Sequence, residues 1–319
     1  MPWSGAITCA SVSPLPTNPT AKPTTDTGVD AGFTVAPPGF RLPPDTRLGV
    51  VRLQVADLAR SIAYYDRVIG LRVLTRTPTT AVLGAREGDD PLIELRARAG
   101  ATPVPHRGRL GLYHFAILLP DRAALGRLLA HLGEIGVRAG MSDHLVSEAL
   151  YLTDPDGLGI EVYADRPRSA WRMRGPALAM ATDPLDASGV VAAANGEPWT
   201  GAPAGTRIGH VHLFVGDLDA AAALYHRALG LDRVELGGLP GALFLSAGGY
   251  HHHLGTNTWA SGAPVATEGD ARLVEWTIIV PSAADVAAAT RSLAGAGYAV
   301  TDAGVADPWG TRVRITAQQ

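Results

Sequence analysis

The strongest constraint on the fold of this chain is an internal repeat, because self-similarity along a sequence means that one supersecondary unit is used more than once. Residues 48–71 (LGVVRLQVADLARSIAYYDRVIGL) and residues 208–231 (IGHVHLFVGDLDAAAALYHRALGL) align over their whole length without a gap. Both segments predict a short strand of alternating apolar residues followed by a helix. Asp57 and Asp217 stand where helix N-caps are expected, and a Gly-Leu pair closes each helix.

Two weaker copies of the repeat begin at Gly111 and Arg272. Each opens with an alternating strand, crosses a proline and enters a helix rich in Ala and Leu. Both copies end in an Asp-Pro-x-Gly turn and a further strand, DPDGLGIEVY from Asp154 and DPWGTRVRIT from Asp307. Proline presets φ in such a turn, and glycine allows the chain to reverse. The sequence therefore predicts four βαβββ modules, at about 48–98 (module one), 110–166 (module two), 207–256 (module three) and 271–317 (module four).

Single modules of this kind bury too little apolar surface to be stable alone, so the modules must pair. The expected fold class is α+β, with the modules paired into two cup-shaped half-barrel domains. By order along the chain, residues 46–170 form a first domain (modules one and two) and residues 207–319 a second (modules three and four). A Pro/Gly/Ala-rich connector at 171–206 separates them. Residues 1–45, rich in Pro, Thr, Ala and Gly, are expected to be a flexible leader outside the fold.

This arrangement resembles the vicinal oxygen chelate superfamily, which includes glyoxalases, bleomycin-resistance proteins and extradiol dioxygenases. The resemblance covers nearly everything after residue 45. The stretch 144–161, HLVSEALYLTDPDGLGIE, is also similar to the signature of extradiol ring-cleavage dioxygenases, although Ser142 stands where that signature has Gly, Asn, Thr, Ile or Val. The signature implies that Glu161 is a metal ligand. Its place within an apolar strand agrees, because a buried carboxylate is costly unless it is paired or bound to metal.

Two histidines occupy equivalent places in modules two and three. His114 and His210 each precede by seven residues the Asp that opens the following helix. In the superfamily this is a metal-ligand position. His212 points the same way along the strand and competes with His210, but the register favours His210. The resemblance thus implies a site of His114, His210 and Glu161, the two-imidazole, one-carboxylate facial set that suits non-haem Fe(II) and also accepts Mn(II).

Modules one and four lack this set of ligands. Val50 and Glu275 occupy the histidine positions, and Arg314 occupies the position of the metal-binding glutamate, where Glu275 and Arg314 can pair with each other. His210 can share a cup with the module-two ligands only if modules two and three form one cup and modules one and four the other, or if subunits exchange modules. A shared site is therefore a hypothesis that conflicts with pairing by order along the chain.

Three consecutive histidines in GGYHHHLGTNTW, residues 248–259, form a further cluster. On a strand, His251 and His253 would share one face and His252 would take the other. The resemblance assigns His252 as the acid–base residue beside the metal, whereas a shift by one residue would nominate His251 or His253. A polar strand end or adventitious metal binding would also explain the cluster.

The resemblance further implies an active-site tyrosine at Tyr151, which lies ten residues before Glu161. Its hydroxyl would donate a hydrogen bond to a substrate or peroxide oxygen, and His144 would be a further donor at the mouth of the site. The implied activity is extradiol (meta) cleavage of a catechol-type diol by O₂ in the catabolism of aromatic compounds. The pattern does not indicate which ring substituents the substrate carries.

Composition argues against several partner classes. The 319 residues carry a formal charge of −3 and no basic stripe, so no nucleic-acid partner is expected. No apolar run approaches the length of a membrane span. The single cysteine, Cys9, rules out an internal disulfide and fits a reducing cytoplasm, and no signal peptide is recognisable. We therefore expect a cytoplasmic enzyme acting on a small aromatic diol and O₂; a homo-oligomer is compatible with the sequence.

Two other functions use the same scaffold. A glyoxalase-type isomerase or transferase typically needs four protein ligands around a divalent metal, and Val50 and Arg314 remove two ligand positions. A binding protein without turnover would hold a small aromatic ligand, but it has no need of a facial triad. Bound iron would favour the dioxygenase, zinc or nickel the isomerase, and no metal the binding protein.

Overall fold

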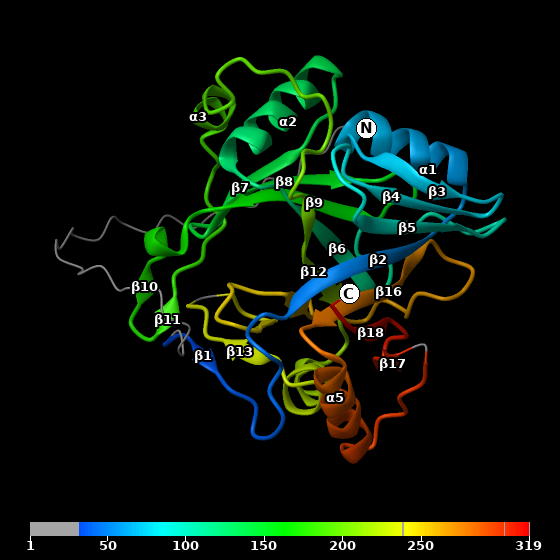
Figure 1. Ribbon diagram of the computed structural model, residues 1–319, viewed down its shortest axis with the longest axis vertical. Coiled ribbons are helices and arrows are strands. Elements are labelled where there is room, and N and C mark those ends of the chain that lie inside the picture. Colours follow the sequence, from blue (N-terminus) through cyan, green and yellow to red (C-terminus); the bar gives the residue numbers. More distant parts are fainter. Residues whose placement is uncertain (1–31, 238, 303, 319) are drawn as a thin grey trace.

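The four predicted modules are present in the computed structural model, which describes residues 32–237, 239–302 and 304–318 (Figure 1). Module one consists of β2 (Arg47–Val55), α1 (Leu58–Tyr64), a π-helical turn η1 (Tyr65–Ile69), β3 (Arg72–Arg76), β4 (Thr80–Gly84) and β5 (Pro91–Ala97). Module two consists of β6 (Gly111–Leu118), α2 (Arg122–Glu134), β7 (Gly140–Asp143), β8 (Ser147–Thr153) and β9 (Gly159–Asp165). Both therefore have the expected βαβββ order.

Modules three and four repeat the pattern with local differences. Module three consists of β12 (Arg207–Phe214), α4 (Leu218–Ala221), a π-helical segment η3 (Ala222–Ala228), β13 (Asp232–Val234), β14 (Ala242–Ser246) and β15 (Leu254–Asn257). Module four consists of β16 (Arg272–Val280), α5 (Ala283–Gly295), β17 (Val305–Ala306) and β18 (Arg312–Ala317). Among the described residues, module four thus has two strands after its helix where three were expected.

The modules pair into two mixed sheets, but not in the order of the chain. One sheet has nine strands in the order β1 (Thr34–Val35), β13, β14, β15, β12, β6, β9, β8, β7, so it joins modules two and three. The other has seven strands in the order β17, β18, β16, β2, β5, β4, β3, so it joins modules one and four. Each sheet therefore takes one module from either side of the connector, and the hypothesis of a cup shared by modules two and three is confirmed.

The segments expected to lie outside the modules are partly structured. Residues 1–31 of the expected leader lie outside the described residues. In the remainder, β1 pairs with β13, Phe33 and Leu42 are buried, and Arg41 forms an ion pair with Asp232 at 2.7 Å, so residues 32–45 are not a free leader. In the connector, β10 (Met173–Arg174) and β11 (Ala177–Leu178) form a hairpin, and α3 (Ala187–Ala192) packs against α2. These contacts were not predicted, because the few apolar residues in these Pro-rich segments follow no helical or strand periodicity.

Local signals in the sequence behave as predicted. The side chains of Asp57 and Asp217 accept hydrogen bonds from backbone N–H groups in the first turns of α1 and α4, which confirms them as N-caps. Gly70 ends the first helix at φ 76°, in the left-handed region that glycine adopts without strain. The helices of modules one and three, however, continue as the π-helical segments η1 and η3, which place Tyr65 and Tyr225 inward and fully buried.

Consecutive modules are joined by buried tyrosine–aspartate contacts. The Tyr65 hydroxyl lies 3.2 Å from Asp154 Oδ2, and the Tyr225 hydroxyl lies 2.8 Å from Asp307 Oδ2. Each aspartate begins an Asp-Pro-x-Gly turn and also accepts two backbone N–H bonds within it. These contacts attach module one to module two and module three to module four, across the two sheets.

No helix in the described part of the chain has the length and apolar character of a membrane span.

Candidate metal centre

Three neighbouring strands in the middle of the nine-stranded sheet carry His114, Glu161 and His210. His114 lies on β6, which pairs with β9 on one side and with β12 on the other. Ala116 on β6 is directly opposite both Glu161 and His210, so these two residues lie in one row across the sheet. His114 is two residues from Ala116 and therefore points to the same face. The pairing of modules two and three thus brings the three residues together.

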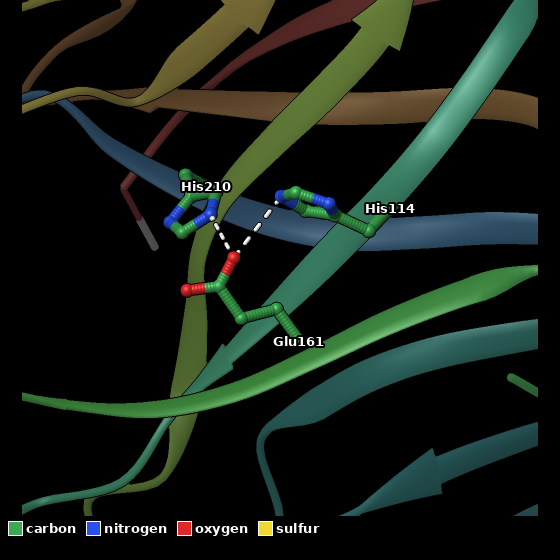
Figure 2. Close-up of side chains that lie close together, drawn as sticks. All are labelled: His114, Glu161 and His210. Carbon is green, nitrogen blue, oxygen red and sulfur yellow. Dashed lines mark hydrogen bonds and ion pairs between the residues drawn. The ribbon is translucent and has the colours of Figure 1, made fainter. Parts of the chain in front are cut away.

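The three side chains converge on one carboxylate oxygen (Figure 2). His210 Nε2 lies 3.2 Å and His114 Nε2 lies 3.1 Å from Glu161 Oε2. One possible ligand atom from each of the three residues lies within 4.8 Å of the others. Two ligands bound about 2.1 Å from one ion and about 90° apart would be about 3 Å from each other, so these spacings fit a shared metal ion.

Several polar atoms in this cluster are buried without a hydrogen bond. His114 Nδ1 and Nε2 and His210 Nδ1 are among them, because the contact of His114 Nε2 with Glu161 is close but poorly oriented for a hydrogen bond. All three residues are at most 5% exposed. Buried polar atoms without partners are costly, and a metal ion bound by the imidazoles would supply a partner for His114 Nε2. The donor set therefore fits a divalent metal of the type that accepts two imidazoles and one carboxylate.

Electrostatics keep these side chains in the forms that bind metal. Burial lowers the pKa of His114 more strongly than Glu161 raises it, so its imidazole is neutral at pH 7. Burial alone would raise the pKa of Glu161, but His210 and His114 together hold it well below its usual range. The site therefore presents a carboxylate next to a neutral imidazole, as metal coordination requires.

His212, the alternative to His210 in the sequence analysis, lies beside the group of three possible ligands and is not part of it. Its ring centroid is 5.0 Å from that of His114, but its Nε2 lies 2.9 Å from the Asn257 side-chain nitrogen. Burial holds the pKa of His212 well below its usual range. A Cβ at Gly255 would lie 2.9 Å from the His212 ring, so this glycine leaves the space that the ring occupies. Neither Asn257 nor Gly255 was identified from the sequence.

The three consecutive histidines lie in the turn before β15 rather than on a strand, and each has a different environment. The His252 ring is 4.2 Å from that of His210, whereas the His251 ring is 6.2 Å from it. His253 Nδ1 accepts a hydrogen bond from the Ala247 backbone N–H. Burial holds the pKa of His252 well below its usual range and lowers that of His253 to about 3. Of the three, His252 is the one packed against the ligand set.

Tyr151 and His144 are hydrogen-bonded to each other at the side of the cluster. His144 Nε2 lies 2.6 Å from the Tyr151 hydroxyl, and His144 Nδ1 lies 2.7 Å from the Ala181 carbonyl oxygen. A carbonyl only accepts, so Nδ1 carries the proton and Nε2 of a neutral His144 accepts from Tyr151. The Tyr151 ring centroid is 5.7 Å from that of His114. Burial raises the pKa of Tyr151 well above its usual range, so it is a neutral phenol.

The equivalent place in the seven-stranded sheet holds an ion-pair network. Arg314 Nε lies 2.7 Å from Glu275, as the sequence indicated, and Arg52 contacts Glu275 as well. Arg52 Nε also lies 2.7 Å from Glu94, which Arg96 contacts in turn. The cationic side chains neutralise the carboxylates here, so this cup holds no set of free ligands among its described residues.

Comparisons with known proteins agree with this architecture. Residues 47–162 and 207–317 match the model of the Glyoxalase/Bleomycin resistance protein/Dioxygenase superfamily. The chain is 45% identical over 260 residues to a catechol-2,3-dioxygenase from Bacillus subtilis (strain 168), which covers 81% of this chain and 91% of that protein.

Solved structures share the fold at much lower identity. A protein from Bacillus subtilis subsp. subtilis str. 168, provisionally described as a dioxygenase, matches with a TM-score of 0.58 at 18% identity, over 85% of this chain and 84% of that one. Glyoxalase I from Zea mays matches with a TM-score of 0.51 at 19% identity, over 85% of this chain and 92% of that one. At these identities the structural matches indicate the fold and not the activity.

Proposed function

Because the chain belongs to the Glyoxalase/Bleomycin resistance protein/Dioxygenase superfamily, we propose that it is an extradiol dioxygenase that cleaves a catechol-type aromatic diol with O₂. The proposed metal is a mononuclear non-haem Fe(II) held by His114, Glu161 and His210. The proposed role is in the breakdown of aromatic compounds. A match to a catechol-2,3-dioxygenase, 45% identical over 81% of the chain, supports this reaction class over the others that occur on the same scaffold.

The observation that carries the proposal is the convergence of two buried imidazoles on one buried carboxylate, from three adjacent strands. Such a set occupies one face of an ion's coordination sphere and leaves the other face for substrates. When bound, Fe(II) would act as a Lewis acid and bring a diol and O₂ together. In the described part of the chain, the group that can hold a metal has three members, fewer than the four protein ligands typical of the glyoxalase-type alternative.

We assign roles in the proposed reaction to three residues beside the ligand set. His252 lies against His210 and is kept neutral by burial, so it can accept a proton from the diol and later return it. Tyr151 lies beside His114, and His144 orients its hydroxyl. In the neutral pair the Tyr151 proton points to His144. The Tyr151 oxygen can then accept a hydrogen bond from the substrate.

The first experiment is anaerobic reconstitution of the purified protein with Fe(II), followed by addition of catechol and air while the visible spectrum is recorded. We expect a yellow ring-cleavage product and about one iron per chain by elemental analysis. His114→Ala and Glu161→Ala should lose both the colour and the iron, because each removes a ligand. His131→Ala, a substitution on α2 outside the cluster, is the matched histidine control and should keep both.

Other outcomes decide between the alternatives. Retained zinc or nickel with no colour from several catechols would contradict the proposal and favour a glyoxalase-type isomerase. Absence of any bound metal, together with binding of aromatic ligands, would favour a binding protein. Ring cleavage that persists in Glu161→Ala would show that the metal lies elsewhere.

A further inference from the structure

Strand β9 contributes more to the site than its metal-binding glutamate. Because side chains alternate along a strand, Glu161, Tyr163 and Asp165 point to the same face. Asp165 is at the end of the strand, and its side chain is 24% exposed. The neighbouring turn before β15 supplies His251 and His252, which are 0% and 6% exposed. A carboxylate at the edge of the site therefore faces two buried imidazoles.

These groups form a continuous line of hydrogen bonds that ends beside the metal centre. Asp165 Oδ1 lies 2.9 Å from His251 Nε2, and His251 Nδ1 lies 2.8 Å from His252 Nδ1. The ring of His252 is 4.2 Å from that of His210. The other oxygen of the carboxylate, Asp165 Oδ2, accepts a hydrogen bond of 2.9 Å from the Tyr250 hydroxyl.

With both imidazoles neutral, counting protons along this line gives the tautomer of each ring. A carboxylate is only an acceptor, so His251 Nε2 must carry a hydrogen. Nδ1 of a neutral His251 then has none and can only accept. The 2.8 Å contact therefore requires a hydrogen on His252 Nδ1. A neutral imidazole carries one hydrogen, so His252 Nε2 is left with a free lone pair.

We propose that Asp165 and His251 are positioning residues that hold His252 in its Nδ1–H tautomer, which leaves His252 Nε2 free to take a proton from the diol. The use of that lone pair rests on the proposed function, whereas the tautomer itself does not. The arrangement follows the general logic by which a carboxylate fixes the tautomer of a histidine base, here through one intervening imidazole.

The carboxylate is itself held in place. The Tyr250 hydroxyl that donates to Asp165 lies 2.6 Å from the Tyr163 hydroxyl, which must donate in turn because Tyr250 has already used its hydrogen. A Cβ at Gly209 would lie 1.8 Å from the Tyr163 hydroxyl oxygen, so glycine is required at this point of β12. The Tyr163–Tyr250 pair, here called the brace, bonds to Asp165 Oδ2, whereas the Asp165–His251–His252 line, here called the relay, starts at Asp165 Oδ1. Each can therefore be removed without the other.

The tautomer can be measured directly by ¹⁵N NMR of histidine-labelled full-length protein at neutral pH, in the metal-free form and with diamagnetic Zn(II). His252→Gln identifies the signal by its disappearance. We expect the Nδ1–H tautomer for His252 in the wild type. In Asp165→Asn, the amide N–H can donate to His251 Nε2, so that His251 Nδ1 carries the hydrogen and donates to His252 Nδ1. The hydrogen of His252 then lies on Nε2. Tyr250→Phe removes the brace and not the relay, so it should keep the wild-type tautomer.

Kinetics test whether the tautomer is used. Asp165→Asn should lower kcat about 10- to 100-fold with KM within about threefold, because the base is blocked while the substrate site is intact. Asp165→Glu should recover most of the rate, and melting temperatures would check that each variant is folded.

Three results are informative in different ways. An Nε2–H tautomer in the wild type, or an unchanged tautomer in Asp165→Asn, would overturn the relay. A changed tautomer with an unchanged kcat would overturn its role in turnover. If the wild type cleaves no catechol, the proposed function fails, while the NMR result still decides the tautomer.

Discussion

The contact between Tyr225 and Asp307 allows a quantitative test of how the two sheets are held together. Tyr225 belongs to module three and Asp307 to module four, both are buried, and the hydroxyl donates to the carboxylate at 2.8 Å. Burial raises the pKa of Asp307 from 3.8 to about 6, and the Tyr225 hydroxyl is the largest influence opposing that rise. Tyr225→Phe removes the hydroxyl and little else.

The sign of the pH dependence follows from linkage. The folded state holds its proton on Asp307 up to about pH 6, whereas the unfolded chain releases it near pH 3.8. Below pH 3.8 Asp307 is protonated in both states and does not destabilise the fold, and the free energy of unfolding falls as the pH rises from 3.8 toward 6. A pKa raised from 3.8 to about 6 corresponds to a total loss of about 3 kcal/mol. Without the Tyr225 hydroxyl the folded-state pKa rises further, so the loss continues to higher pH.

The expected size of the effect depends on the charge of Asp307. At pH 8 the lost hydrogen bond is to a carboxylate and is worth about 1.5–3 kcal/mol, whereas at pH 5 it is to a neutral acid and is worth about 0.5–1.5 kcal/mol. Tyr225→Phe should therefore cost about 1 kcal/mol more at pH 8 than at pH 5. Urea denaturation of metal-free protein at both pH values, with the slope m checked for constancy, measures this difference.

Two further variants control for loss of a hydroxyl as such. Tyr65→Phe removes the equivalent but longer contact to Asp154, 3.2 Å, and should show the same sign with a smaller size, since burial also raises the pKa of Asp154 to about 6. Tyr298→Phe, at a half-buried position whose hydroxyl bonds to no described residue in the structure, should be nearly neutral at both pH values. An equal or larger loss at pH 5 in Tyr225→Phe would refute the reasoning.

Two other substitutions probe equivalent positions on the first strands of modules two and four, five residues before each helix cap. Ala116 is fully buried between Glu161 and His210, so Ala116→Leu should push the ligands apart. We expect metal affinity to fall about 100-fold and the free energy of unfolding to fall by about 1–3 kcal/mol. A metal titration with wild-type affinity would contradict this. Thr277 has a buried hydroxyl without a hydrogen-bond partner, so Thr277→Val should raise the free energy of unfolding by about 1 kcal/mol and leave metal affinity unchanged; a loss of stability in urea denaturation would indicate a partner for that hydroxyl.

Much of the fold was readable from the sequence because its signals are local. The repeat predicted four modules, and Asp57 and Asp217 predicted helix starts that the structure confirms, since an N-cap depends only on the first turn that it closes. The π-helical segments were not predictable. They satisfy packing of Tyr65 and Tyr225 against aspartates more than 80 residues away in the sequence.

The sequence by itself also nominated His114 and His210, which share a register in modules two and three, and Glu161, through its likeness to the extradiol signature. Order along the chain, however, favoured pairing modules one and two, which would have separated His210 from the other two residues. Strand pairing depends on which apolar faces and edges fit together, and that is a long-range property which no local pattern records.

Only the tertiary structure decided which polar side chains face each other inside the shared cup. In the structure His252 packs against His210, and His212 is hydrogen-bonded to Asn257. Asp165 of module two is hydrogen-bonded to His251 of module three. These partners are 42 to 86 residues apart in the sequence. Hydrogen bonds act over about 3 Å, so partners this distant in sequence are fixed only when the sheet brings β9, β12 and the turn before β15 together.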